Sequence, residues 1–600
     1  MPHTAIPLAA TTAGGDLLVA AVMLPVVGIL LSLLFGGRTV ERLAMLILPL
    51  NLVIALLVFI DLWQSGEPLA YVVGGWTPPL GVALRADGLS AAMMVTTAAV
   101  ACAIGVYARA DFLTPAGVVE ARSPFVFWPL LLGVCSAMNL VCIGGDLFTL
   151  YVAMELLTFA AVPMVSLDGR AETLKAALRY LLFAIAGSIL YLLGITLLYG
   201  TYGTLDIARL SRLAQPDFAT ICTLALMTTG LLAKTALFPL HLWLPSAHAG
   251  APAAASAALS ALVVKGSFFL VIRLWFDVMP ALPGSGGATI LGVLGATAII
   301  FGGIMALRQQ RLKLLVAYST VAQIGYLFLI FPLAWNAQSG RLESGAALAG
   351  GLLQVMAHAT AKAGMFMAAG TIYAAFGHDR IAQLAGAGRA LPISVLAFVC
   401  GGGTLVGLPF GGAFLAKSLL LESPVASEQW WWDWIMFAGS TLTSAYVIVV
   451  MTRTLTRARM SQAACASVPR YQQMTALVLA LSSLLLGLAV FGVLGIIQIG
   501  RPDAAYVIAV APRFFDVFSF AAILKAFNPV VLGTVLAIGH MWRERARAMA
   551  ADAVACSGKR SPARLALLDQ VDRALRQWPV GSTSLLFLTI AFGAAMFAAH

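Results

Sequence analysis

The chain has 600 residues, of which 61% are hydrophobic and only 10% charged, so it lacks the polar surface that a soluble protein of this length needs. Apolar runs of about 20 residues, long enough to cross a hydrocarbon core of about 30 Å, recur from Leu17 almost to the C-terminus. We count about sixteen of them, which predicts an all-α, polytopic membrane helix bundle. The formal charge of +11 therefore does not indicate a nucleic-acid partner.

Basic residues alternate sharply between the loops. When the helices are taken in order, 24 lysines and arginines fall in loops on one side and seven in loops on the other. The positive-inside rule makes the richer side cytoplasmic, which predicts a multi-pass protein of the cell inner (plasma) membrane with both termini outside the cytoplasm. No Lys or Arg precedes the first apolar run, and Asp16 stands where a signal peptide would be positive, so we expect a retained first helix.

The predicted helices fall into four segments. Residues 1–115 hold three helices, and two blocks of five helices follow, in 116–280 and 281–455. The last segment, 456–600, adds looser helices, for about 14 core helices in total and about two more near the C-terminus. In that segment we expect a helix from about 516 to 540 bearing Lys525, and a last apolar run that crosses the membrane again. The stretch between them, 541–578, is basic and is expected at the cytoplasmic surface, with a plain connecting loop as the alternative.

Each five-helix block contains an apolar segment interrupted by proline or glycine beside a lysine. The first is Lys234–Pro239 and the second is Leu408–Lys417. Proline removes a backbone donor and breaks a helix, and a membrane interior tolerates the freed polar groups only against protein or water. A pair of broken helices in corresponding places predicts two inverted repeats with an ion site near the midplane. Two packing kinks are the alternative.

Ionisable residues within the two blocks are the candidate site. They are Glu155, Lys234, Lys265, His358, Lys362 and Lys417. Each buried charge costs about 2.5–3.5 kcal/mol, so the five that are Lys or Glu would cost roughly 12–18 kcal/mol if unpaired. They must therefore be paired, hydrated or neutral. In contrast, Glu41, Asp61, Asp87, Asp111 and Asp146 lie at predicted helix ends, where we expect them to be solvated.

The spacing of these residues indicates a proton path. Lys234 and His241 are seven residues apart, and His358 and Lys362 are four apart, so each pair shares a helix face if its helix is unbroken. Burial lets a lysine release its proton, and a nearby carboxylate favours the charged form again. A Glu–Lys pair that can part and re-form is thus a proton switch. A purely structural ion pair is the alternative reading.

Nothing in the sequence points to a cofactor, a metal or a catalytic residue. The seven cysteines show no paired spacing, and no run of them suits an iron–sulfur cluster. No glycine fingerprint stands between a strand and a helix for a dinucleotide. We therefore expect no redox chemistry in this chain itself, which leaves open whether it is a subunit of a larger oxidoreductase.

Several motifs resemble the proton-conducting antiporter-like family. That family includes membrane subunits of respiratory complex I, the A and D subunits of Mrp sodium/proton antiporters, and membrane-bound hydrogenase subunits. The matching stretches are Gly75–Pro79 (GWTPP) with Asp87–Ser90 (DGLS), Asp146–Leu157 (DLFTLYVAMELL), Lys234–His248 (KTALFPLHLWLPSAH), Tyr318–Tyr326 (YSTVAQIGY) and His358–Lys362 (HATAK). They cover about 70–500 in the family's order, and the first looks most like the Mrp D-type members.

The resemblance implies a role for each candidate residue. Glu155 and Lys234 would form the input pair, Lys265 the central relay and Lys417 the end of the path, with His358 or Lys362 linking to it and His241 and His248 as accessory groups. Three positions depart from the family pattern: Arg179, Ser246 and Phe410. The missing carboxylate at Ser246 leaves the entry of protons or sodium open.

The implied function is proton translocation, or sodium/proton antiport, as one subunit of a complex I-like or Mrp-type assembly with other membrane subunits. A coupling partner in an inorganic-carbon uptake or hydrogenase assembly is the rival function. A third reading, an independent transporter of a small solute, has only the repeats in its favour.

Overall fold

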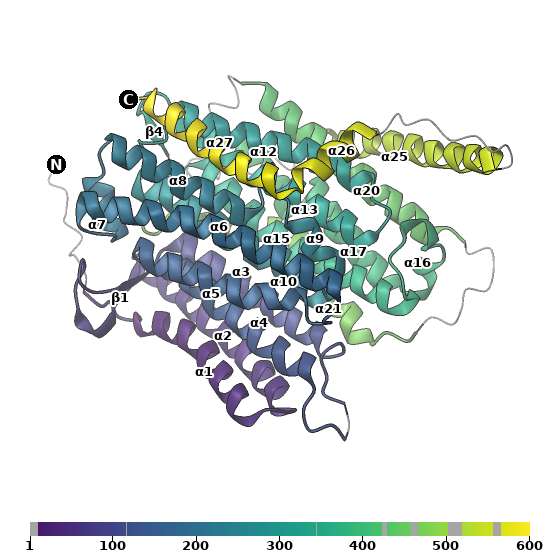
Figure 1. Ribbon diagram of the computed structural model, residues 1–600, viewed down its shortest axis with the longest axis horizontal. Coiled ribbons are helices and arrows are strands. Elements are labelled where there is room, and N and C mark those ends of the chain that lie inside the picture. Colours follow the sequence, from purple (N-terminus) through teal and green to yellow (C-terminus); the bar gives the residue numbers. More distant parts are fainter. Residues whose placement is uncertain are drawn as a thin grey trace.

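The computed structural model describes residues 10–115, 117–343, 345–422, 429–457, 466–501, 519–555 and 566–600. Within these residues the chain is almost entirely helical, with its long helices side by side (Figure 1). Fourteen of the described helices are long and apolar enough to cross a membrane. This confirms the predicted membrane helix bundle.

The N-terminal segment contains three long helices and a hairpin. Its helical elements are α1 (Asp16–Phe35), α2 (Thr39–Ser65), the short η1 (Val73–Gly75) and α3 (Gly88–Ala108). Strand β1 (Leu69–Val72) pairs antiparallel with β2 (Ala83–Ala86), with Leu69 opposite Ala86.

The first block supplies five helical stretches of membrane length, one of which ends at a break. Its elements are α4 (Arg122–Ile143), α5 (Leu147–Val165), α6 (Ala171–Tyr202), α7 (Ile207–Leu213), α8 (Phe218–Thr235), α9 (Leu244–Gly250), α10 (Ala253–Ala258), η2 (Leu259–Val263), α11 (Val264–Ile272) and η3 (Arg273–Val278). Aspartates cap the first turns of α5, α7 and α8, where each side chain accepts a backbone N–H.

The second block is centred on a long buried helix, α15. Its elements are α12 (Gly284–Leu307), α13 (Leu312–Phe328), α14 (Ile330–Ala334), the hairpin β3 (Trp335–Asn336) and β4 (Arg341–Leu342), α15 (Ala346–Phe376), η4 (Ile381–Gln383), α16 (Ala387–Ala390), α17 (Pro392–Val406), α18 (Gly412–Leu421) and α20 (Trp431–Leu455). Although α15 has 31 residues, it is not among the fourteen, since Gln354, His358 and Lys362 lower its mean hydropathy.

Both predicted interruptions are present. Helix α8 ends at Thr235, Ala236 has a positive φ of 59°, and the chain becomes helical again only at Leu244. Helix α17 ends at Val406, Gly407 has a φ of 95°, and α18 begins at Gly412. That the two blocks are inverted repeats stays a prediction.

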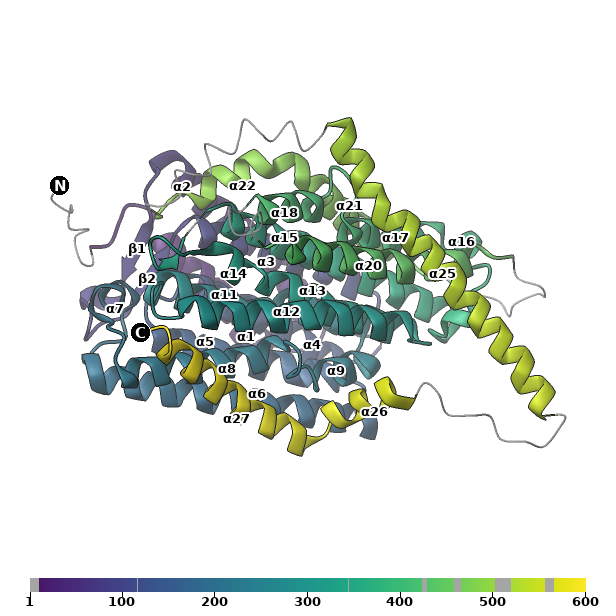
Figure 2. The same ribbon diagram turned by 90° about the horizontal axis from the view of Figure 1, so that it is seen from above.

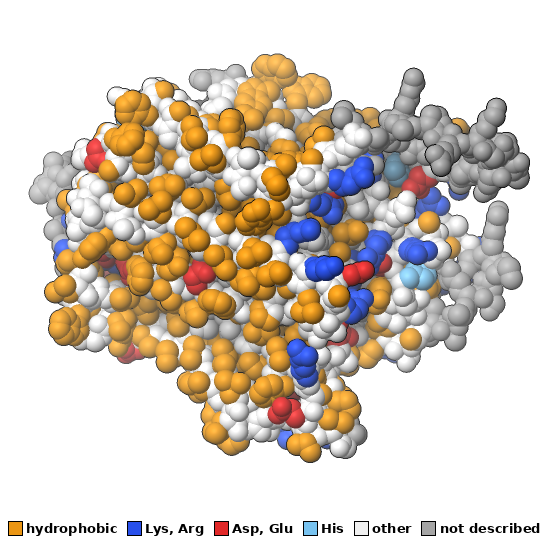
Figure 3. Space-filling view, viewed as in Figure 1, with side chains coloured by type: hydrophobic (Ala, Val, Ile, Leu, Met, Phe, Trp, Pro, Cys, Tyr) orange, Lys and Arg blue, Asp and Glu red, His pale blue; other side chains and the backbone are white. Residues whose placement is uncertain are grey.

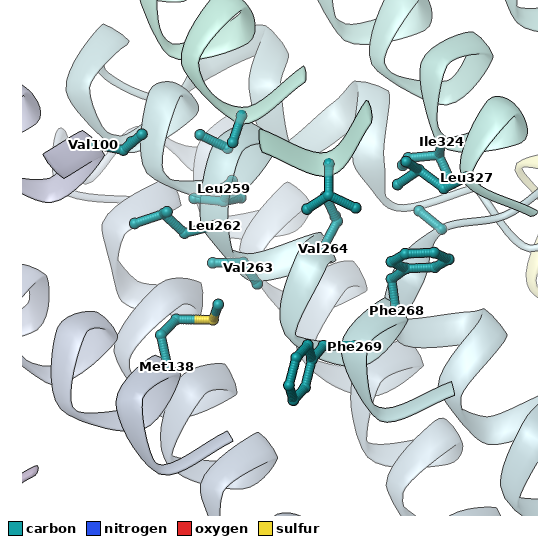
Figure 4. Close-up of a cluster of buried hydrophobic side chains, with 14 of the residues drawn as sticks. Val100, Met138, Leu259, Leu262, Val263, Val264, Phe268, Phe269, Ile324 and Leu327 are labelled. Carbon is teal, nitrogen blue, oxygen red and sulfur yellow. The ribbon is translucent and has the colours of Figure 1, made fainter. Parts of the chain in front are cut away.

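The centre of the molecule is the continuous helical stretch from Ala253 to Val278, whose apolar window is entirely buried. Figure 4 shows Leu259, Leu262 and Phe268 of this stretch packed among side chains of neighbouring helices. These neighbours include Val100 of α3, Met138 of α4 and Ile324 of α13. Lys265 lies in this stretch, so the predicted central relay sits in the most enclosed part of the fold.

The C-terminal segment wraps the outside of the bundle. Its elements are α21 (Arg470–Leu485), η5 (Leu486–Ala489), α22 (Val490–Ile497), α25 (Phe520–Ala555), α26 (Ala566–Leu575) and α27 (Trp578–Phe597). Helix α25 packs on α20, while α27 packs on α8 and α12, so the two lie along different sides of the bundle (Figure 2). The stretch expected as a surface segment or loop, 541–578, is helical over 541–555 and 566–575, and α27 begins at its last residue, Trp578. Residues 556–565 of this stretch lie outside the described residues.

The described ends of the chain lie at one end of the bundle. The Thr12 amide donates to the Ala70 carbonyl of β1 at 2.9 Å, and β1 and the C-terminus are on the same side in Figure 1. Lysine and arginine side chains gather toward the opposite end of the face seen in Figure 3, whereas the rest of that face is mostly apolar. This arrangement matches the loop asymmetry predicted from the sequence.

Candidate functional site

The predicted input pair is formed. The Lys234 ammonium, in the last turn of α8, lies 2.6 Å from a carboxylate oxygen of Glu155 in α5. Lys234 also donates to the Thr158 hydroxyl at 3.2 Å, and Ser188 of α6 donates its hydroxyl to Glu155. The Lys234 side chain is 6% exposed and the Glu155 side chain 18%, so one partner is enclosed while the other reaches the outer face of the bundle.

Two glycines bring the helices of this pair together. A Cβ on Gly187 of α6 would lie 2.6 Å from the Gly230 carbonyl of α8, and a Cβ on Gly230 would lie 2.3 Å from the Gly187 carbonyl. Close backbone contact of this kind is how small residues join helices in membranes. A cavity of about 10 Å³ touches the pair, which is on the order of the space for one water molecule.

Lys265 is held by neutral groups. It follows the π-helical η2, and its ammonium donates to the Ser260 carbonyl of that turn. The Ser260 hydroxyl lies 2.9 Å from that of Thr320 in α13. On the other side, the Thr235 hydroxyl at the end of α8 donates to the Ser267 hydroxyl of α11 at 2.9 Å. One hydroxyl contact therefore joins the end of α8 to α11, and a separate one joins η2, whose Ser260 carbonyl binds Lys265, to α13.

Lys362 is fully buried and also lacks a carboxylate partner among the described residues. Its ammonium donates to the Ser319 hydroxyl and, at 3.3 Å, to the Val316 carbonyl of α13. His358 lies one turn earlier on α15, on the same face as predicted, and is 0% exposed.

Two of the three buried histidines have unpaired ring nitrogens. No group in the described parts of the chain bonds either nitrogen of His248 or His358. Buried polar groups are normally satisfied by protein or by ordered water, so these rings mark places where water would bind. His248 stacks on Phe366 at 4.6 Å between ring centroids. Lys234 and His241 do not share a helix face, because α8 ends between them.

Lys417 occupies the second break. Its ammonium donates to the carbonyls of Leu405 and Val406, at 3.2 and 2.9 Å, and to the Ser440 hydroxyl at 2.8 Å. It also lies 4.8 Å from the centroid of the Tyr326 ring. The last carbonyls of a helix have no intrahelical donor and carry the negative end of its dipole, so the end of α17 is a cation site.

Uncharged side chains that the sequence analysis missed link α15 to α20. Gln354 donates to Gln323 of α13 at 3.1 Å, and Gln323 donates to Thr443 of α20 at 3.5 Å, three residues from Ser440. Gln354, His358 and Lys362 stand at four-residue intervals, a pattern that could have revealed Gln354. The other polar partners become neighbours only when distant helices pack.

The expectation of solvated carboxylates at helix ends is wrong for Asp87. Its two oxygens accept bonds from Arg273, at 2.6 and 2.7 Å, and Arg273 and Arg501 both pair with Asp277. Burial alone would raise the pKa of Asp87, but the two guanidinium groups hold it well below its usual range. Glu41 is likewise paired, with Arg109 at 2.9 Å.

A cavity of about 520 Å³ opens at the arginine-rich end and contains Ser246, the position that departs from the family pattern. Three carboxylates line it, namely Asp111, Asp168 and Glu172, together with Arg170, Arg311 and Lys313. Burial raises the pKa of Asp111 even though Gln472 donates to it at 3.0 Å. The cavity therefore has carboxylates from other elements although none stands at 246.

Comparison with known proteins decides the family. Residues 144–444 match the family described as NADH:quinone oxidoreductase/Mrp antiporter, TM. The chain belongs to this family. All eight candidate residues, from Glu155 to Lys417, lie within the matched region of the NADH:quinone oxidoreductase/Mrp antiporter family.

Individual relatives and structures agree with this family. The chain is 35% identical over 393 residues to the N subunit of the NADH-quinone oxidoreductase of Desulforudis audaxviator, covering 64% of this chain and 75% of that protein. It is 26% identical over 383 residues to the D subunit of the Na(+)/H(+) antiporter of Alkalihalophilus pseudofirmus, covering 63% and 74%. Its fold matches a chain of the Mrp complex from Dietzia sp. with a TM-score of 0.71 and 22% identity, over 83% of this chain and 100% of that one.

Proposed function

We propose that this chain translocates protons across the cell inner membrane as one subunit of a complex I-like or Mrp-type multisubunit complex. The observation that carries the proposal is the state of the four path lysines, of which Lys417 is half-buried and the other three are buried. Among these four, and within the described residues, Lys234 alone has a carboxylate within ion-pair distance, whereas Lys265, Lys362 and Lys417 bond hydroxyls and carbonyls. A lysine in an apolar setting without an anionic partner can release its proton. A purely structural role would instead require each of these lysines to have a carboxylate partner, and three of the four have none among the described residues.

The geometry supports a switch at the input pair. While Glu155 lies against Lys234, it favours the charged ammonium; when Glu155 moves away, Lys234 is left with the Thr158 hydroxyl and can release its proton. The proton then passes to Lys265 and, through Lys362 or His358, to Lys417. The glutamines do not titrate, and their role would be to orient water between these groups. The unpaired histidine nitrogens support hydrated gaps between these groups.

Sodium/proton antiport is the second candidate. It is favoured by the 26% identity to the D subunit of a Na(+)/H(+) antiporter and by the carboxylates around the large cavity. A coupling partner without transport, the rival function, would have no use for a row of buried lysines, since each costs free energy in a membrane.

We also propose that the arginine-rich end faces the cytoplasm and that both termini face away from it. The excess of basic residues in the loops at that end supports this orientation. The large cavity would then open to the cytoplasm.

The test is ion transport by the purified native complex in proteoliposomes, whose subunits would first be identified. We expect Glu155→Ala and Lys234→Ala each to abolish transport while the amount of complex in the membrane stays nearly normal. Lys525→Ala is the matched control, because Lys525 also lies on a long apolar helix. Its side chain is 75% exposed, and its ammonium is as far as 3.9 Å from the Asp433 carboxylate, so the pair is weak. Normal transport by both of the first two variants would refute the path.

A further inference from the structure

Three consecutive residues of α13 contact three different parts of the molecule. Tyr318 donates its hydroxyl to Asp572 of α26, Ser319 accepts a bond from Lys362, and Thr320 meets the Ser260 hydroxyl of η2. Successive side chains on an α-helix point about 100° apart, so one short stretch can reach α26, α15 and η2 at once. The rotation of α13 about its axis therefore sets two positions together: that of the hydroxyl which binds Lys362, and that of the hydroxyl which meets Ser260, the residue whose carbonyl binds Lys265.

The contact with α26 is buried. The Tyr318 hydroxyl is 2.8 and 2.9 Å from the two carboxylate oxygens of Asp572, and the two residues are 0% and 5% exposed. Tyr318 is six residues beyond Leu312, which is about 9 Å along α13 from its first turn. Asp572 thus contacts α13 more than one turn from the start of that helix.

The buried carboxylate is charge-compensated. Arg576 lies 2.7 Å from Asp572, one turn later on the same stretch, and its guanidinium stands 5.4 Å from the centroid of the Tyr318 ring. Burying a charged group is unfavourable unless it is paired and hydrogen-bonded, and here both conditions are met. Helix α26 also lies outside residues 144–444, so the family match does not account for this contact.

We infer that Asp572 is a positioning residue for the ion path, which it affects through Tyr318. The hydrogen bond fixes the rotation and depth of α13, and thereby holds Ser319 against Lys362 and Thr320 against Ser260, the residue whose carbonyl binds Lys265. Without it, α13 turns slightly and both hydroxyls move, while the Glu155–Lys234 pair on α5 and α8 is unaffected. The C-terminal helix is then part of the transport machinery. This inference rests on the proposed function of the path.

The experiment uses the whole complex in proteoliposomes with Asp572→Ala, Asp572→Asn, Tyr318→Phe and the double variant Tyr318→Phe/Asp572→Ala. Small displacements of transfer groups are costly, so we expect Asp572→Ala and Tyr318→Phe each to slow transport roughly ten- to hundredfold. Their pH profiles of transport should be displaced alike. The double variant should be no slower than either single one, because the same contact is lost. Asp572→Asn, whose amide oxygen can still accept the hydrogen bond from the Tyr318 hydroxyl, should recover part of the rate.

Gln570→Ala, at an exposed position of the same helix, is the control and should behave as wild type. Wild-type rates and pH profiles in Tyr318→Phe would overturn the inference, and so would independent, multiplying effects in the double variant. If Asp572→Ala does not assemble, Tyr318→Phe and Asp572→Asn decide, since both retain the size of the side chain. Normal transport by Glu155→Ala and Lys234→Ala would instead refute the proposed function itself.

Discussion

The Lys417 ammonium donates to the carbonyl of Val406, the last residue of α17, at 2.9 Å. A cation placed at the carboxyl end of a broken helix satisfies backbone groups that would otherwise be unpaired in an apolar interior. The partner is a dipole and not a carboxylate, so removing the lysine leaves no isolated charge behind. Lys234 differs in this respect, because its removal would leave Glu155.

This difference predicts the effect of Lys417→Met. The methionine side chain has a similar length, and the carbonyls at the end of α17 keep the Ser440 hydroxyl nearby, so we expect nearly normal amounts of assembled complex. Transport should be lost because the last group of the path can no longer take a proton. Quantifying the complex by immunoblot and measuring transport in vesicles would check both parts. Near wild-type transport would show that the path does not end at Lys417.

Lys234→Arg separates a titrating lysine from a structural one. Arginine keeps a positive charge beside Glu155 but does not release its proton in the physiological range. We therefore expect the ion pair and the amount of protein to be preserved while transport falls to the background level. Lys234→Ala provides the comparison. If the pair were merely structural, this change would leave Glu155 without its partner, lower the stability of the protein by about 3–5 kcal/mol and reduce its amount in the membrane. Transport at the wild-type rate with arginine would rule out a titrating Lys234.

The buried cluster around Asp87 is expected to stabilise the fold and not to carry ions. Asp87→Asn leaves Arg273 short of a charge partner, and breaking a buried pair costs about 3–5 kcal/mol. Asp433→Asn is the control, because the Lys525–Asp433 pair is largely exposed and such pairs contribute about 0–1 kcal/mol. Thermal unfolding of the purified complex should show a marked fall in unfolding temperature for Asp87→Asn and almost none for Asp433→Asn.

The same cluster predicts a pH dependence. Because the folded-state pKa of Asp87 lies below its ordinary value of 3.8, its contribution is complete above that value and is lost as the pH falls through the lower, folded-state pKa. The difference in unfolding temperature between wild type and Asp87→Asn should therefore be constant from pH 5 to pH 8 and shrink only in stronger acid. A difference that already shrinks between pH 7 and pH 5 would contradict this.

The charges of the path could be predicted from the sequence because each is an exception in an apolar run. Lys265 or Lys362 has no place in a membrane helix unless it is paired, hydrated or functional, whatever the tertiary structure. The hydroxyl partners could not be predicted in this way, since Ser319 and Thr320 can bond a carbonyl of their own helix and so cost little in a membrane. They become informative only when a polar group from another helix lies beside them. Asp87 was misjudged because its partner, Arg273, is 186 residues away.

The proposed orientation can be tested by thiol labelling. His600 is exposed at the C-terminus, and Glu172 is exposed at the arginine-rich end, beside the large cavity. In intact cells, a membrane-impermeant reagent should label His600→Cys and not Glu172→Cys, whereas both should react after the membrane is opened. The parent chain is the control, because it has cysteines of its own. Labelling of Glu172→Cys alone in intact cells would reverse the orientation.

The close contact of α6 and α8 predicts a strong effect of Gly230→Ala. The added methyl group would lie 2.3 Å from the Gly187 carbonyl, and a backbone atom cannot move aside without shifting the whole helix. Separating the helices moves Lys234, one turn after Gly230, away from Ser188 and Glu155, so transport should fall even where the protein still assembles. Gly200→Ala on α6 is the matched control, because nothing lies within 4 Å of its added carbon and alanine favours a helix. Equal behaviour of the two variants in assembly and in transport would show that this contact does not position the input pair.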